Sequence, residues 1–189
     1  MKAVRVLCAA GTLLTLVAAP RPAAAAPSGE ARVRDLSIVY DGGQVLASFR
    51  LDGGFTQHVL DRVESGLPTT FVYELELERD RKRWSDDTLD STRLEVVAMF
   101  NAVTREYLVN TKLAGKLVDS ETLHDPGDLE RAMTRFTALP VFPLEHPDPH
   151  ERYLLRVRVE LGMGHVIYFV PVLRTTDWVE SNKIRVRNP

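Results

Sequence analysis

Apolar and polar residues alternate with a period of two along most of the chain, which is the pattern of a β-strand with one buried face. The clearest run is 71–78, where apolar side chains take one face and acidic side chains the other: Phe71, Tyr73, Leu75 and Leu77 against Glu74, Glu76 and Glu78. The same pattern predicts further strands over 33–40, 44–51, 93–103, 107–111, 116–120, 153–161 and 166–172, with a closing strand at 184–186. Turn residues at Asp41-Gly42-Gly43 join the first two strands as a hairpin.

Two segments change to a helical period. Over 55–65, apolar residues recur four apart, at Phe55, Val59 and Val63, and Gly66 provides a stop. A second helix is expected to start at Asp125, which can cap it, and to end before Pro140. The elements together predict an α+β fold, mainly an antiparallel β-sheet with a sandwich-like arrangement and two short helices.

The segment 79–91 is polar and is expected to be a connection between two strands. The predicted strands 71–78 and 153–161 carry complementary charges on their outward faces: Glu74, Glu76 and Glu78 on the first, and Arg156 and Arg158 on the second. We therefore expect these strands to lie next to each other, because opposite charges on adjacent strands stabilise a sheet by about 0.2–1 kcal/mol per pair.

The first 26 residues have the three parts of a cleavable secretory signal peptide. Lys2 and Arg5 precede an apolar run, and an Ala-x-Ala site follows at Ala23–Ala25. The run is shorter than the roughly 20 residues that span a bilayer, so no transmembrane span is expected after cleavage. We expect a Sec-type signal at 1–26, cleaved after Ala25 or Ala26, then a flexible segment at 27–32 and a single domain at 33–188 in the periplasm.

Loss of the signal peptide also changes the composition. Cys8 is the only cysteine of the chain and lies within the signal. The exported part is therefore expected to have no disulfide, no thiol nucleophile and no thiolate metal site. The whole chain has 24 Lys and Arg against 26 Asp and Glu, and removing Lys2, Arg5 and Arg21 makes it more acidic. This balance argues against nucleic acid as a partner.

The motifs of common enzymes are missing. The chain has no Gly-x-Ser-x-Gly elbow and no glycine-rich phosphate loop, and its five histidines are not spaced as zinc ligands. We assign no catalytic, cofactor or metal residue. The best binding candidate is a basic and aromatic cluster in the 79–91 connection, which suits an acidic partner: Arg81, Lys82, Arg83 and Trp84.

Several short motifs occur in a familiar order. They are Gly66-Leu67-Pro68, the run 71–77, Arg83-Trp84, the segment 101–107, and Thr176-Asp177-Trp178 followed by Ser181. Over residues 33–188 the chain resembles the domain-of-unknown-function family 4390 of Gram-negative bacteria. The resemblance implies an exported protein with no assigned activity. It also implies, by gene association, a partner role beside a membrane sensor histidine kinase.

These observations favour an exported, non-enzymatic interaction or accessory protein whose partner is a membrane signalling protein. The alternative is a periplasmic carrier that encloses a small ligand or lipid in an apolar cavity, and a hydrolase without a known motif is a weaker third choice. The sequence leaves the identity of the partner and the oligomeric state open.

Overall fold

The structure is a computed structural model that describes residues 30–81, 87–161, 166–167, 170–171 and 174–186. Its larger sheet has seven antiparallel strands in the order β11-β8-β3-β4-β5-β6, with β12 also paired to β8. The strands are β3 (Thr69–Arg79), β4 (Asp87–Asn101), β5 (Glu106–Leu113), β6 (Lys116–Leu123), β8 (Tyr153–Leu161), β11 (Arg174–Thr175) and β12 (Val179–Glu180).

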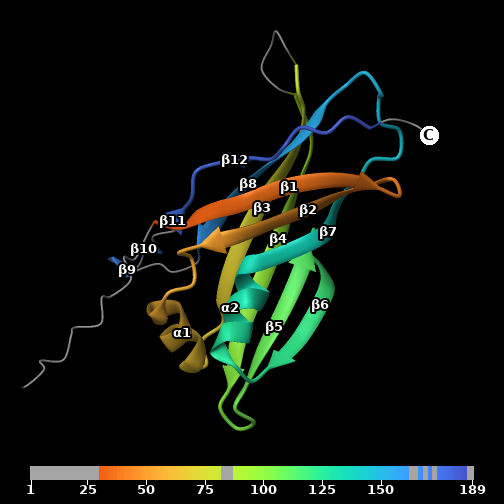
Figure 1. The fold of residues 1–189 in the computed structure, drawn as a ribbon. Helices are drawn as coiled ribbons and strands as arrows, with labels where there is room; N and C mark the ends of the chain where they lie inside the picture. Colours follow the sequence, from red (N-terminus) through yellow and green to blue (C-terminus); the bar gives the residue numbers. More distant parts are fainter. Residues whose placement is uncertain (1–29, 82–86, 162–165, 168–169, 172–173, 187–189) are drawn as a thin grey trace, which may run out of the picture.

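A smaller sheet of three antiparallel strands lies across one face of the larger one (Figure 1). It contains β1 (Arg32–Asp41), β2 (Gln44–Asp52) and β7 (Arg135–Pro143), with β2 in the middle. The helices α1 (Gln57–Glu64) and α2 (Pro126–Thr134) cover the part of the large sheet that the small sheet leaves free. The predicted α+β fold with two short helices is confirmed.

The core lies between the two sheets and is built by the alternation seen in the sequence. The inward residues of β3 and β8 are buried, and so are Leu94, Val96 and Ala98 of β4, whereas Phe100 of β4 is only partly buried. At the centre, the ring of Phe49 from β2 lies 5.5 Å from that of Tyr73 on β3 and 4.8 Å from that of Phe136 on β7. The buried Tyr73 hydroxyl donates a hydrogen bond of 2.6 Å to the Met133 carbonyl at the end of α2. This cluster joins both sheets to a helix.

The predicted turns and caps are present. Gly42 and Gly43 both have positive φ, as a tight hairpin between β1 and β2 requires. Asp125 accepts the backbone N–H groups of Gly127 and Asp128 and so caps α2. The first helix begins at Gln57, after Phe55, and Gly66 follows its end with a φ of 81°.

Three sequence predictions of elements are wrong in detail. The segment 87–91 belongs to β4, since it pairs with 76–79 of β3, so the polar connection is shorter than expected. No strand was predicted at β7, which starts directly where α2 ends. The expected strand 166–172 is represented by two short strands, β9 (Val166–Ile167) and β10 (Val170–Pro171), that pair with each other. The residues 162–165 of the preceding expected turn lie outside the described ones.

The C-terminal segment attaches to both sheets through side chains. The hydroxyls of Thr176 and Ser181 accept the backbone N–H groups of Val159 and Leu155 on β8, each at 3.0 Å. The Asn182 amide accepts the N–H of Ile38 on β1 at 2.9 Å and donates to its carbonyl at 3.2 Å. The closing strand expected at 184–186 is reduced to a single bridge between Ile184 and Tyr153.

Candidate functional site

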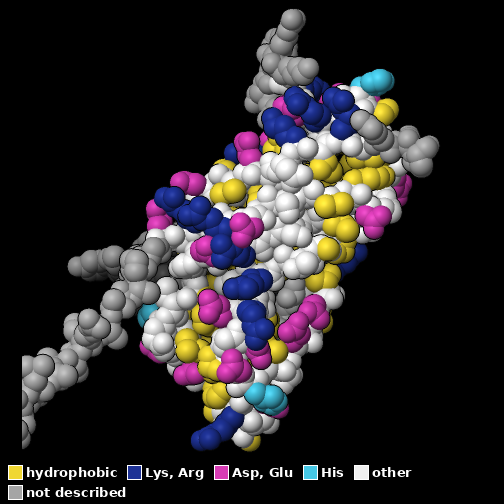
Figure 2. All heavy atoms as spheres, in the orientation of Figure 1, with side chains coloured by type: hydrophobic (Ala, Val, Ile, Leu, Met, Phe, Trp, Pro, Cys, Tyr) yellow, Lys and Arg dark blue, Asp and Glu magenta, His cyan; other side chains and the backbone are white. Residues whose placement is uncertain are grey.

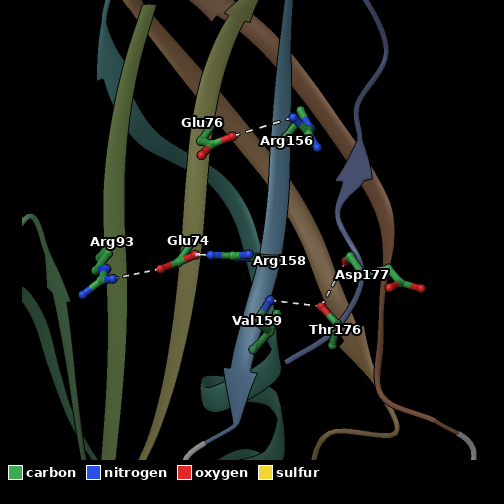
Figure 3. Close-up of polar contacts among 8 residues, drawn as sticks. All are labelled: Glu74, Glu76, Arg93, Arg156, Arg158, Val159, Thr176 and Asp177. Atoms are coloured by element: carbon green, nitrogen blue, oxygen red, sulfur yellow. Dashed lines mark hydrogen bonds and ion pairs between the residues drawn. The ribbon is translucent and has the colours of Figure 1, made fainter. Parts of the chain in front are cut away.

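The outer face of the large sheet carries a row of paired charges. Glu74 on β3 lies directly between Arg158 on β8 and Arg93 on β4 in the strand register. Its carboxylate accepts hydrogen bonds from both, at 2.5 Å from Arg158 and 2.9 Å from Arg93 (Figure 3). The predicted pairing of the acidic strand with the arginine strand is therefore confirmed.

The next pair of residues along β3 and β8 is also oppositely charged, but its shorter ion pair is made with the acidic residue two positions further along β3. Glu76 stands opposite Arg156, 3.9 Å away, whereas the shorter contact of Arg156 is with Glu78, at 3.0 Å. Glu78 itself stands opposite Leu154, and its side chain is only 5% exposed. The hydrogen bond with Glu78 raises the pKa of Arg156, against the lowering effect of burial. This face of the sheet is thus charged but internally neutralised.

The same balance acts on Glu74. Partial burial by itself raises the pKa of this carboxyl, but the hydrogen bonds and charges of Arg158 and Arg93 outweigh it and lower the pKa below its ordinary value. Glu74 is consequently held in its ionised form.

Trp178 covers these arginines because the chain bulges beside β8. Thr176 bonds to Val159 and Val179 pairs with Val157, so two residues, Asp177 and Trp178, stand opposite the single residue Arg158. The Trp178 ring lies 4.6 Å from the Arg158 guanidinium and 4.9 Å from that of Arg156. This contact was not predicted from the sequence. The two arginines were expected to point outward, but nothing in the sequence placed Trp178 over them.

The predicted patch at Arg81, Lys82, Arg83 and Trp84 is described only in part. Lys82, Arg83 and Trp84 lie outside the described residues. Arg81 is the second residue after β3 and forms an ion pair of 2.9 Å with Asp87, the first residue of β4. The patch therefore stays a prediction, and only the position of Arg81 is described.

Further basic side chains gather at the end of β3. Arg152 and Lys183 both contact Asp80, at 2.5 and 3.1 Å, and Arg79 lies 3.9 Å from Glu151. Figure 2 shows Lys and Arg side chains concentrated where β3 and β4 leave the body of the protein. We call Arg79, Arg81, Arg152 and Lys183 the basic end. It brings together residues from three separate parts of the sequence.

A groove opens on the other side of the molecule, between the edge strands of the two sheets. It has a volume of about 310 Å³ and lies between β6 of the large sheet and β7 of the small sheet, with α2 between them. Apolar and charged residues share its lining, with Val109, Phe136 and Leu139 among the former and Asp119, Glu121 and Arg135 among the latter. This groove was not predicted from the sequence, because β7 was not predicted.

The histidines do not converge on a metal site in the part of the chain that is described. His58 is on α1, His124 follows β6, and His146 and His150 lie in the loop before β8, while His165 is outside the described residues. Among the described residues, no group of three or more His, Asp or Glu side chains is arranged to hold a metal. Within the same residues, no helix has the length and apolar character to span a membrane.

Comparison with known proteins supplies a family. The family model described as "Domain of unknown function (DUF4390)" matches residues 28–166. The chain belongs to the DUF4390 family. Neither the curated proteins nor the solved structures gave a match. The match covers β1 to β8, and therefore the small sheet, both helices and the charged rows on β3, β4 and β8, whereas β11 and β12 of the large sheet lie beyond it.

Proposed function

We propose that this DUF4390 protein is an exported, non-enzymatic interaction protein of the periplasm. It binds an acidic segment of a membrane signalling protein, of the sensor histidine kinase class, through its basic end. The signal peptide pattern at 1–26 supports the location. The absence of known catalytic motifs from the sequence supports a non-enzymatic role.

The observation that carries the proposal is the gathering of basic side chains at one end of an acidic protein. Arg79, Arg81, Arg152 and Lys183 lie where the end of β3 meets the start of β4, and the sequence adds Lys82, Arg83 and Trp84 in the connection between these strands. Arg81 and Lys183 are exposed, with side chains 47% and 41% accessible. Arginine with a neighbouring tryptophan is the composition that dominates binding energy at protein interfaces.

The carrier alternative has less support. Between the sheets, where a carrier would hold a lipid, the rings of Phe49, Tyr73 and Phe136 are in contact with each other. Their packing fills the centre of the core.

The test is crosslinking of the mature protein to native membranes, followed by capture and identification of the bound proteins. Wild type is compared with the triple variant Arg81→Glu/Arg83→Glu/Trp84→Ala. We expect one membrane signalling protein to be captured by wild type and lost with the variant, with circular dichroism confirming that the variant is folded. The Arg81 ion pair is exposed, so its loss costs only about 0.5 kcal/mol.

A matched control makes the same types of change away from the basic end, in the turn after β4 and on α2. In Arg105→Glu/Arg131→Glu/Val103→Ala, two charges are reversed and one exposed apolar side chain is shortened, as Val103 is 92% accessible. This control should capture the partner as well as wild type does. Equal capture by the basic-end variant would exclude the basic end as the docking surface, and no specific capture by any of the proteins would overturn the interaction role.

A further inference from the structure

The groove between β6 and β7 has the size and lining of a small-molecule site. Its volume of about 310 Å³ is at the lower end of the range for ligand pockets. Val109 and Leu113 of β5 and Phe136 and Leu139 of β7 provide an apolar surface, and Ala132 of α2 also lines the groove. Val118, at its β6 side, is 51% exposed. An apolar body of small size therefore has a surface on which to pack.

The β6 wall of the groove carries two carboxylates. Asp119 and Glu121 are two residues apart on one strand, so they share a face, and they pair in register with Thr111 and Val109 of β5. Among the described residues, neither carboxylate forms an ion pair. Glu74 and Glu78 on the outer face of the sheet are instead held by arginines.

The electrostatics of Glu121 show the consequence. Partial burial, a hydrogen bond with Asp119 and the charge of Asp119 all raise the pKa of the Glu121 carboxyl. A cation placed next to this pair would offset the repulsion between the two carboxylates, so the β6 wall favours a positively charged group.

The β7 side of the groove offers the opposite charge. Arg135, the first residue of β7, lines the groove and makes no ion pair with the other described residues. An arginine presents a planar set of donors that suits a carboxylate. The groove thus combines an anionic wall, an apolar surface and a cationic rim.

We propose that this groove binds a small zwitterion with an apolar body, that is, an apolar amino acid or short peptide. The ligand's ammonium group lies against Asp119 and Glu121, its carboxylate against Arg135, and its apolar part on Val109, Phe136 and Leu139. This site is separate from the basic end, so it does not depend on the docking role proposed above.

Three probes that share a phenyl ring separate the contributions. L-Phenylalanine has both charged groups, 2-phenylethylamine lacks the carboxylate, and 3-phenylpropionate lacks the amine. Each is titrated into the isotopically labelled mature protein, and binding is followed by two-dimensional NMR. We expect L-phenylalanine to shift the amide signals of the groove residues with a Kd of about 1 mM or below.

Two conservative variants provide the decisive comparison. Asp119→Asn/Glu121→Gln should weaken L-phenylalanine and 2-phenylethylamine by about tenfold, equivalent to about 1.4 kcal/mol, and leave 3-phenylpropionate unchanged or tighter. Arg135→Gln should weaken L-phenylalanine and 3-phenylpropionate and spare 2-phenylethylamine. The spectrum of each unliganded variant shows whether it is folded.

The proposal is overturned if no probe shifts the groove signals, if the shifts map elsewhere, or if the variants bind all three probes as wild type does. The triple variant of the basic end should bind L-phenylalanine normally. A failure of the groove site is therefore distinguishable from a failure of the docking role.

Discussion

The carboxylate of Glu74 lies 2.5 Å from the guanidinium of Arg158, its direct partner on the neighbouring strand β8. Arg93 approaches the same carboxylate from β4. One acidic residue therefore connects the three central strands of the large sheet on the side that faces away from the core. Because these contacts hold the pKa of Glu74 below its ordinary value, the sheet depends on this residue being ionised.

Replacing Glu74 by Gln should make the protein less sensitive to acid. A carboxyl whose pKa is lowered on folding stabilises the protein above its unfolded pKa and loses that effect as the pH falls through the folded pKa. We expect Glu74→Gln to cost about 1 kcal/mol at neutral pH, and the difference from wild type to shrink below about pH 4. Urea unfolding at several pH values measures this. Glu130→Gln, on the exposed side of α2, serves as a control that should follow wild type, and a constant difference for Glu74→Gln at all pH values would contradict the prediction.

Deprotonation of Tyr107 should lower the stability of the protein at alkaline pH. Its hydroxyl donates a 2.7 Å hydrogen bond to Glu64 at the end of α1. Burial, this bond and the charges of Glu64 and Asp125 raise the pKa of Tyr107 to about 12. Because the pKa is raised on folding, Tyr107 makes its full contribution to the free energy of unfolding below the unfolded pKa of about 10. That contribution is lost as the pH rises from there to about 12.

The variant Tyr107→Phe should therefore have a flatter stability profile between about pH 10 and 12 than wild type, measured by urea midpoints. The buried Tyr73, whose pKa burial also raises, remains in both proteins and adds the same alkaline loss. Tyr40→Phe removes a hydroxyl that bonds to the Leu144 carbonyl and provides a control for loss of a hydrogen bond alone. Identical alkaline profiles for wild type and Tyr107→Phe would show that the Glu64 contact is unimportant.

The Thr176 hydroxyl should matter for the attachment of the C-terminal segment. It is the acceptor for the Val159 N–H of β8, which the bulge at Asp177 and Trp178 would otherwise leave without a partner. Thr176→Val keeps the shape but removes the acceptor, so we expect a loss of about 1–3 kcal/mol in the free energy of unfolding. Thr176→Ser retains the hydroxyl and should lose much less. Equal losses for both variants in urea titrations would indicate that packing of the methyl group is what counts.

Ala114 offers a stabilising change. It is the first residue of the turn between β5 and β6 and has a φ of 50°, a conformation that costs alanine about 1 kcal/mol. Asparagine adopts it more easily and precedes a glycine in the preferred turns of this type. Ala114→Asn should therefore raise stability by about 0.5–1 kcal/mol. In the reverse direction, Gly115→Ala places a side chain at a φ of 75° and should destabilise, although the space around it is open. Thermal unfolding of both variants checks the two signs.

The parts of the fold that could be predicted from the sequence are strands with one buried face and one solvent-exposed face. In β3 and β8 every second residue faces the core, so alternation and charge were enough to predict the strands and the pairing of Glu74 with Arg158. The strand β7 has no such alternation. It contains Pro140 and Pro143 and pairs with β2 through two irregularities in register. An edge strand tolerates these prolines because only one side has to bond to a neighbour.

The candidate sites were harder to predict for a related reason. The basic end was indicated in part, because Arg81 is close in sequence to Lys82, Arg83 and Trp84, but Arg152 and Lys183 join it only through the sheet. The groove unites β6, α2 and β7, and no local pattern marks it. Asp119 and Glu121 resemble ordinary surface residues of an exposed strand until β7 is placed opposite them.

The two bonds between Ile38 and Asn182 join residues that are 144 positions apart in the chain. The first strand consequently cannot form its bonds to Asn182 until almost the whole domain has been synthesised. Contacts of such long range slow folding. A chain that emerges N-terminus first therefore lacks this link between the first strand and the C-terminal segment until residue 182 has emerged.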